Sequence, residues 1–273
     1  MEPHVMGVLN VTPDSLLDGG RYFDHAAAIR HGEEMIADGA DIVDVGGEST
    51  RPGAEPVDEE EELRRVLPVV AALAARARVS IDTMKPAVAR AAVGAGATLI
   101  NDVGGSLAGI AAESGAGLVV MHRRGTPKDM DERAHYDDVA AEVFTSLGGA
   151  AAAARRAGIA EVYVDPGIGF AKTAAHNVAL LRALPALVAA GVPVLVGTSR
   201  KRFLGRLGAL GPSPLPPGER LAGSVATAVW SMRCGARIVR VHDVSATVQA
   251  RALLGPRASG EPAPPAWLAA VGQ

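Results

Sequence analysis

The 273-residue sequence contains few aromatic side chains and only one cysteine. Aromatic residues make up 3% of the chain and hydrophobic residues 48%, so a hydrophobic core must be built from Ala, Val, Leu and Ile. Cys234 alone excludes a disulfide framework within the chain. Long apolar runs are also missing: Val5–Leu9 is too short for a signal peptide or a membrane span, and charges, Gly or Pro interrupt the later runs. These absences predict a soluble cytoplasmic protein with no membrane partner.

The net charge bears on the kind of partner, and the length of the chain bears on the fold. The net charge of -3 gives no reason to expect nucleic acid as a partner. The length fits a single α/β barrel, which typically has roughly 250 residues.

Short apolar runs alternate with longer stretches of helical periodicity. Such alternation is typical of a parallel sheet whose strands are connected by helices. The count of eight runs favours a closed barrel, (β/α)8 or TIM barrel in a single domain, over an open sheet. The predicted strands are Val5–Leu9, Asp41–Val45, Val79–Ile81, Thr98–Ile100, Gly117–Met121, Val162–Val164, Val192–Val196 and Ile238–Val241.

Local signals predict where some helices begin. Asp58 is a suitable N-cap, and Glu61 stands three residues later, as in a capping box. Pro86 fits the first turn of another helix. Gly211–Gly218, with four prolines, predicts a long loop before the seventh helix of the barrel.

The two ends of the chain differ in composition. We assign residues 1–254 to the barrel. Residues 255–273 are rich in Pro and Ala, which predicts a poorly ordered tail.

Polar residues follow each predicted strand. In a parallel barrel these positions share one rim, where barrel enzymes place their chemistry. A single Asp after a strand is more often a helix N-cap or a turn residue. Polar groups at all eight positions predict a ligand site, although they do not specify a reaction. They are Asn10, Gly46–Gly53, Asp82, Asn101, His122, Asp165, Thr198–Lys201 and His242.

Two N-terminal motifs resemble the signatures of dihydropteroate synthases. They are Met6–Ser15, with the sequence MGVLNVTPDS, and Asp44–Gly53, with the sequence DVGGESTRPG. The resemblance implies a transferase of folate biosynthesis, which condenses 6-hydroxymethyl-7,8-dihydropterin diphosphate with p-aminobenzoate to give 7,8-dihydropteroate and diphosphate. It also implies a sulfonamide target, and we expect a homodimer. Similar segments continue in order through Ser80–Thr83, Asn101–Val103, Met121–His122, Arg124–Pro127, Asp165–Phe170, Ser199–Lys201 and Arg240–Asp243.

By this resemblance, Asn10, Arg240 and His242 bind the diphosphate leaving group. Asn10 offers a neutral amide oxygen to Mg2+, the expected cofactor, and diphosphate oxygens and water complete its coordination. Arg240 and His242 are two residues apart on one strand, so their side chains face the same way. Taken alone, Arg240 could equally be an ion-pair residue at the rim and His242 a turn histidine.

The resemblance also assigns a pterin site. The pterin edge presents adjacent N–H donors, which the carboxylate of Asp165 accepts as a pair. Lys201 donates to the pterin carbonyl oxygen and a ring nitrogen, and it counts with the diphosphate ligands as catalytic. Met121 and Phe170 pack on the ring faces, although either could be a core residue. The remaining pterin-site residues are Asp82 and Asn101, and Gly197 is expected among the substrate-binding residues.

The p-aminobenzoate site is assigned to loops that carry enough Gly and Pro to close over the substrate, Val11–Gly20 and Gly47–Gly53. Asp18 belongs to the first of these loops and is the last expected catalytic residue. The residues expected beside p-aminobenzoate are Thr50, Arg51, Pro52 and Ser199.

The first loop departs from the family at Leu16 and Leu17, where Phe and Ser are usual. This change affects the amine site and predicts tolerance to sulfonamides. Two alternatives stay open, a non-catalytic or altered-specificity pterin-binding paralogue and a barrel methyltransferase that uses a methylated folate. The methyltransferases share the Asp and Asn pattern but bind no diphosphate, so Lys201, Arg240 and His242 favour the synthase.

Overall fold

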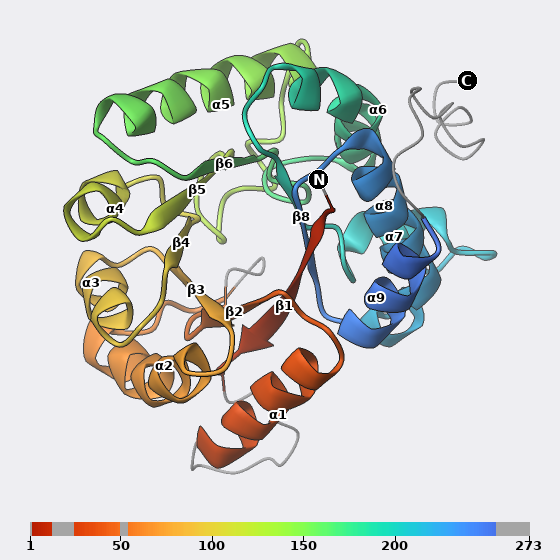
Figure 1. The fold of residues 1–273 in the computed structure, drawn as a ribbon. Helices are drawn as coiled ribbons and strands as arrows, with labels where there is room; N and C mark the ends of the chain where they lie inside the picture. The colour runs from red at the N-terminus through yellow and green to blue at the C-terminus, as the bar shows by residue number, and fades with distance from the viewer. Residues whose placement is uncertain (1, 13–24, 50–53, 255–273) are drawn as a thin grey trace.

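The computed structural model describes residues 2–12, 25–49 and 54–254. Within these residues, one sheet of eight strands curves around a central axis and helices surround it (Figure 1). The strands are β1 His4–Asn10, β2 Ile42–Gly46, β3 Arg78–Thr83, β4 Leu99–Asp102, β5 Gly117–Met121, β6 Val162–Asp165, β7 Leu195–Val196 and β8 Ile238–Val241. The helices are α1 His25–Ala37, α2 Glu59–Ala74, α3 Pro86–Gly94, α4 Ala108–Ser114, α5 Val139–Arg156, α6 Ala174–Ala189, α7 Arg202–Leu207, the 3-10 helix η1 Pro217–Glu219, α8 Leu221–Cys234 and α9 Val244–Ala252.

Every strand pairs in parallel with its neighbours in the order β6-β5-β4-β3-β2-β1-β8-β7. A parallel bridge between Val164 and Val194 links β6 to the segment before β7 and completes the ring. The predicted (β/α)8 barrel is therefore confirmed.

Alternation along the strands produces two separate hydrophobic clusters, because successive side chains point to opposite faces of a strand. The larger cluster joins the outward-facing strand residues to the helices, and Val43, Val79 and Val239 belong to it. The smaller cluster fills the inside of the barrel, and its members are Met6, Ile42, Leu99, Val119, Tyr163, Leu195 and Ile238. As expected, both clusters are largely aliphatic.

Several local predictions are confirmed. Asp58 caps α2 by accepting a hydrogen bond from the Glu61 backbone N–H at 2.8 Å. The reciprocal half of the predicted capping box is wrong, because the Glu61 carboxylate pairs with Arg64 and Arg65 instead of returning to the Asp58 backbone N–H. Pro86 begins α3, and Cys234 is buried at the end of α8.

The structure corrects the prediction for the seventh strand and adds a helix after it. We expected a strand over Val192–Val196, but β7 begins only at Leu195. Pro193 lacks an N–H and cannot donate to a sheet ladder, although its carbonyl accepts from Val164 at 2.9 Å. The sequence analysis also missed α7. The Pro-rich segment ends in η1 and leads into α8, which is the seventh helix of the regular barrel repeat.

The strands extend further toward the rim than predicted. Asn10, Asp82 and Asp165 lie inside β1, β3 and β6 rather than after them. No helix among the described residues is long and apolar enough to span a membrane.

Candidate active site

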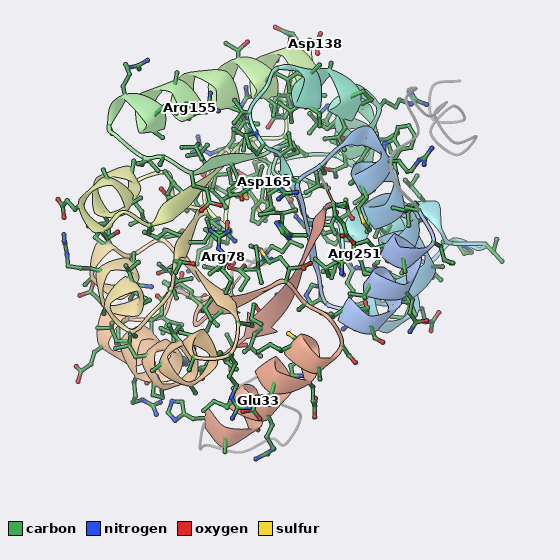
Figure 2. All side chains as sticks on the ribbon, viewed as in Figure 1. Glu33, Arg78, Asp138, Arg155, Asp165 and Arg251 are labelled. Atoms are coloured by element: carbon green, nitrogen blue, oxygen red, sulfur yellow. The ribbon has the colours of Figure 1, made fainter. Side chains whose placement is uncertain are left out.

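The strand registers bring the predicted polar residues together at the carboxyl end of the barrel. Asp82 on β3 pairs in register with Asn101 on β4, and Met121 on β5 pairs with Asp165 on β6. Figure 2 shows Asp165 at the inner side of the barrel, whereas Asp138 and Arg155 lie at the outer helix α5.

A cavity of about 550 Å³ opens at this end. Seven of the predicted site residues that the structure describes line it, namely Asn10, Asp82, Phe170, Ser199, Lys201, Arg240 and His242. Among the described residues, Asn101, Met121, Asp165 and Gly197 lie outside the cavity wall. Asn101 and Asp165 are nonetheless buried polar residues, and Gly197 lies next to Arg240, since a Cβ there would be in ordinary contact with the Cβ of Arg240 at 3.6 Å.

Arg240 lies between two buried carboxylates. Its Nε donates to Asp44 Oδ2 at 2.6 Å, and its Nη2 donates to Asp82 Oδ2 at 2.7 Å. Burial works against the charged guanidinium, but the two carboxylates outweigh it and raise the pKa of Arg240. Arg240 is thus a fixed cation in the cavity wall.

Burial shifts the acids and the amine of the site toward their neutral forms. It raises the pKa of Asp82 to about 7, although Arg240 opposes the shift, and it also raises the pKa of Asp165. Burial lowers the pKa of Lys201 to about 8. The protein interior thus stabilises the charged forms of these groups only in part. A ligand that hydrogen-bonds to them would supply the missing stabilisation.

The loop after β6 approaches Lys201 closely. The Lys201 ammonium donates to the carbonyl oxygen of Ile168 and lies 4.7 Å from the ring centroid of Phe170. Gly167 has a positive φ of 66°, and its N–H donates to Asp165 Oδ1 at 2.7 Å. The loop thereby places an aromatic ring and an ammonium group in one wall of the cavity.

Ser199 and His242 are joined across β7 and β8. Ser199 Oγ lies 3.1 Å from His242 Nδ1 and accepts from the His242 backbone N–H, also at 3.1 Å. These contacts orient the imidazole at the cavity wall, as the predicted diphosphate-binding role requires.

Lys172, a buried amine in the cavity wall, was not predicted from the sequence. Its Nζ lies 3.0 Å from His122 Nδ1, and it donates to the carbonyl oxygens of Phe170 at 3.0 Å and His122 at 3.4 Å. Burial lowers the pKa of Lys172 to about 7 and that of His122 to about 4. Lys172 stands two residues after the Asp165–Phe170 motif, and this proximity was the available sequence signal. The residue between them, Ala171, has a positive φ.

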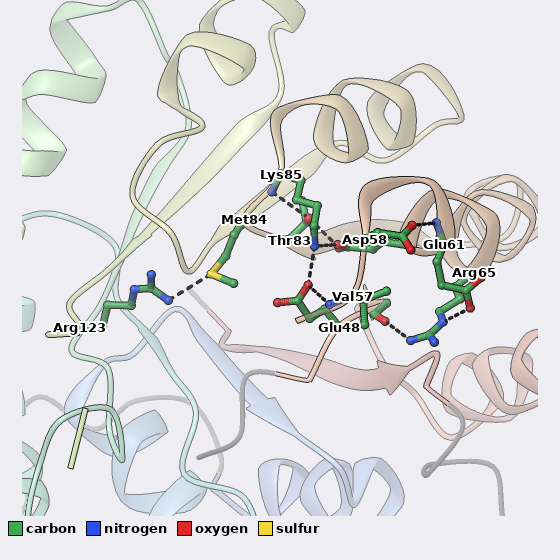
Figure 3. A network of polar contacts seen from close by, with 11 residues as sticks. Glu48, Val57, Asp58, Glu61, Arg65, Thr83, Met84, Lys85 and Arg123 are labelled. Carbon is green, nitrogen blue, oxygen red and sulfur yellow. Dashed lines mark hydrogen bonds and ion pairs between the residues drawn. The ribbon is translucent and has the colours of Figure 1, made fainter. Parts of the chain in front are cut away.

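A buried ion network beside the second motif, Asp44–Gly53, was also not predicted from the sequence (Figure 3). Lys85 contacts both Glu48 and Glu62, and Thr83 Oγ1 donates to Glu62 Oε1 at 2.7 Å. Glu48 Oε2 also accepts from the Val57 backbone N–H at 3.1 Å. The network ties the segment that follows β2 to β3 and α2.

Other predicted residues fall where the structure gives no description. Asp18, Thr50, Arg51 and Pro52 lie outside the described residues, as do Leu16 and Leu17 and the tail from residue 255. Their assignments stay predictions.

The donors around Asn10 are compatible with Mg2+ only if a substrate supplies most of the ligands. Across the described ranges no three His, Cys, Asp or Glu side chains are grouped to hold a metal ion. Asn10 lines the same cavity as Arg240 and His242, which suit an anion. A neutral amide oxygen together with phosphate oxygens and water fits the oxygen-rich, partly hydrated shell of Mg2+.

Comparison with known proteins identifies the family. Residues 6–242 match the model of a family described as pterin binding enzyme. The dihydropteroate synthase of Mycobacterium leprae is 50% identical over 262 residues, which cover 92% of each protein. A structure of Xanthomonas albilineans dihydropteroate synthase with 4-aminobenzoic acid has a TM-score of 0.85 at 47% identity, covering 93% of this chain and 92% of that chain. Another structure of that enzyme, in complex with 7,8-dihydropteroate, has a TM-score of 0.82 at 44% identity, covering 93% and 92% respectively. The chain belongs to the pterin-binding enzyme family.

Proposed function

We propose that this chain is a dihydropteroate synthase, which transfers a pterinylmethyl group from 6-hydroxymethyl-7,8-dihydropterin diphosphate to the amine of p-aminobenzoate. The observation that carries the proposal is the cavity at the carboxyl end of the barrel, where Arg240 and His242, for a diphosphate, and the buried carboxylate of Asp82, for a pterin edge, line one cavity. The relatives that bear this name match nearly the whole chain.

The reaction breaks the bond between the pterin methylene carbon and the diphosphate oxygen. It forms a bond between that carbon and the arylamine nitrogen, which then loses a proton. A neutral arylamine is already a nucleophile, so the protein needs no nucleophilic side chain. The protein must instead stabilise the negative charge that develops on the departing diphosphate.

Arg240, Lys201 and His242 meet that need. Arg240 is a permanently charged, forked donor, and its position between Asp44 and Asp82 fixes it before substrate arrives. Bound Mg2+, with Asn10 as one ligand, would neutralise further charge on the diphosphate. The methyltransferase alternative involves no diphosphate and gives these three side chains no such role.

Asp165, Asn101 and Asp82 are proposed to bind the pterin. An ionised carboxylate accepts two adjacent N–H donors of the aminopyrimidinone edge. Because burial raises the pKa of Asp165, a pterin that donates to the carboxylate stabilises its ionised form. The resemblance leaves Ser199, Thr50, Arg51 and Pro52 to p-aminobenzoate and Asp18 to the loop that closes over it.

A product assay with omissions tests the proposal. The protein is incubated with pterin diphosphate, Mg2+ and p-aminobenzoate, and dihydropteroate and diphosphate are measured. We expect both products in equal amounts and neither one when the pterin substrate or p-aminobenzoate is omitted. Binding of both substrates without product would favour the non-catalytic paralogue.

We further propose a cytoplasmic homodimer. The exposed apolar side chains of Leu207, Leu210 and Leu221, on or beside α7 and α8, support an interface there. Light scattering after size exclusion measures the mass: a dimer is expected, and a monomer at micromolar concentration would contradict it.

A further inference from the structure

Asp44 is an acidic residue on the inner face of β2. The barrel fold alone does not explain why a carboxylate is buried there or which residues it contacts. It stands between Ile42, which belongs to the core inside the barrel, and Gly46 at the rim. Its side chain is fully buried. A buried carboxylate is costly unless it is paired, so its partners indicate what it is for.

One oxygen of Asp44 serves two residues that are distant in the sequence. Asp44 Oδ2 accepts from Arg240 Nε at 2.6 Å and from Asn101 Nδ2 at 3.1 Å. Arg240 belongs to the diphosphate end of the proposed site, and Asn101 belongs to the pterin end. A single carboxylate therefore touches a residue from each half of the substrate site.

The contact determines which edge of Arg240 is available. Asp44 holds Nε and Asp82 holds Nη2, while Nη1 makes no hydrogen bond within the described ranges. Arg240 lines the cavity, so the remaining donors are available to an anion. Without Asp44, the guanidinium would keep Asp82 as its partner but lose the second point that fixes its plane.

The same contact determines which way the Asn101 amide points. Because Nδ2 donates to the carboxylate, the amide oxygen points away from it, and a flipped amide would bring two acceptors together. The amide oxygen therefore stays available as an acceptor, which is what the proposed pterin contact of Asn101 requires. Asp44 thus specifies the hydrogen-bonding character that Asn101 presents.

We propose that Asp44 is a positioning residue that orients Arg240 for the diphosphate and Asn101 for the pterin, so that both halves of the substrate depend on one buried carboxylate. The proposal deepens the proposed function and rests on it. Asp44 acts through these two side chains and does not itself touch the substrate.

Asp44→Asn tests the proposal with little change in volume. Its amide can accept from one of the two donors but presents its own N–H group toward the other. Ser80→Ala is the matched control. Ser80 is the register partner of Asp44 on β3, is also fully buried, and its hydroxyl has no hydrogen-bond partner within the part of the chain that the structure describes.

Calorimetry with two separate probes, inorganic diphosphate in the presence of Mg2+ and 6-hydroxymethylpterin, measures the two halves of the site. We expect Asp44→Asn to weaken both affinities at least tenfold and Ser80→Ala to change neither by more than twofold. Arg240→Lys should weaken diphosphate alone, and Asn101→Ala should weaken the pterin alone. In the Arg240→Lys background, Asp44→Asn should reduce diphosphate affinity by less than threefold further, because its effect passes through the missing guanidinium.

The proposal is overturned if Asp44→Asn keeps either affinity within twofold of the parent, or if Ser80→Ala causes equal losses. Should Asp44→Asn fail to fold, Asp44→Glu keeps the charge but displaces its oxygens by one methylene group. It should lose the same two affinities, and parental affinities in this variant would also reject the proposal. Turnover of the parent protein separates the two hypotheses: a parent that binds both probes but makes no dihydropteroate contradicts the proposed function and leaves the role of Asp44 standing.

Discussion

The two ends of the barrel use charged side chains differently. At the amino end, Arg78 donates to both oxygens of Glu161, at 3.0 and 2.5 Å, and Tyr163 donates to the same carboxylate at 2.6 Å. Arg78 also donates to Thr98 at 3.2 Å. Arg78 and Glu161 remain partly exposed to solvent, so each charge there has both a partner and water.

At the carboxyl end the charges are more deeply buried and incompletely paired. Asp44 and Asp82 share Arg240, and Asp82, which lines the cavity, has one buried carboxylate oxygen without a partner among the described residues. Burial raises the pKa of Asp82 to about 7, whereas at the amino end the partners of Glu161 outweigh burial and lower its pKa. The difference indicates that the amino end is completed by folding, whereas the carboxyl end is completed by a ligand.

Among the substitutions that test this difference between the two ends, Asp165→Asn should have the largest effect. The substitution replaces one acceptor with a donor that faces the N–H edge of the pterin. An unpaired buried polar group costs roughly 1–3 kcal/mol, so pterin affinity should fall at least tenfold while the thermal midpoint changes little. Calorimetry and thermal unfolding measure the two quantities, and an unchanged affinity would place the pterin site elsewhere.

A smaller effect is expected from Lys172→Met, which removes the amino group that joins the Phe170 carbonyl to His122. The loop beside Lys201 should then be held less firmly. We expect KM for pterin diphosphate to rise between about threefold and tenfold with a smaller change in kcat, because a lost neutral hydrogen bond is worth roughly 0.5–1.5 kcal/mol. Lys172→Arg should recover part of the loss, and a fall in kcat at constant KM would assign Lys172 a different role.

The first loop allows a prediction that rests on the sequence alone. An aromatic contact is worth roughly 0.5–1.5 kcal/mol, but its loss at Leu16 should weaken substrate and drug alike. Selectivity requires Leu17 to hinder the longer sulfonamide more than the substrate. The ratio of the sulfonamide inhibition constant to KM for p-aminobenzoate should therefore fall severalfold in the Leu16→Phe, Leu17→Ser double variant. A constant ratio rejects the idea, and activity that appears only in the double variant would indicate a non-catalytic parent.

A different kind of effect concerns pH. Burial lowers the pKa of folded Lys172 to about 7, below its ordinary value of 10.5, so between these values the unfolded chain binds more protons. Stability from this group therefore rises with pH across that window, and the penalty for burying it is fully present below pH 7. Denaturant unfolding at pH 7 and pH 9 should show a smaller rise in Lys172→Met than in the parent. Equal rises would mean that Lys172 stays protonated in the folded protein.

Much of the site could be predicted because strand ends identify the rim. Asn10, Asp82, Asn101 and Asp165 stand at the carboxyl ends of apolar runs, where a parallel barrel exposes side chains to a common cavity. The length of β7 was overestimated because Pro193 interrupts its hydrogen bonding. An apolar run in the sequence does not show such an interruption.

Asp44 and Lys172 were missed for physical reasons. Asp44 lies two residues before the end of β2, so only the inward phase of the strand shows that it reaches the site. Lys172 is brought back to His122 by a loop whose residues Gly167, Gly169 and Ala171 all have positive φ. Apolar periodicity carries no information on such a path, and the partners of both residues are distant in the sequence.

A matched pair of substitutions tests the contrast between the two ends most directly. Arg78→Lys and Arg240→Lys each keep the positive charge and remove a forked donor, at the amino and carboxyl ends respectively. We predict that Arg78→Lys lowers the thermal midpoint by roughly 2–4 °C and keeps dihydropteroate formation near the parental rate. Arg240→Lys should instead reduce kcat/KM for pterin diphosphate at least tenfold with a midpoint close to that of the parent. Equal losses of turnover in both variants, or a loss confined to Arg78→Lys, would contradict the account.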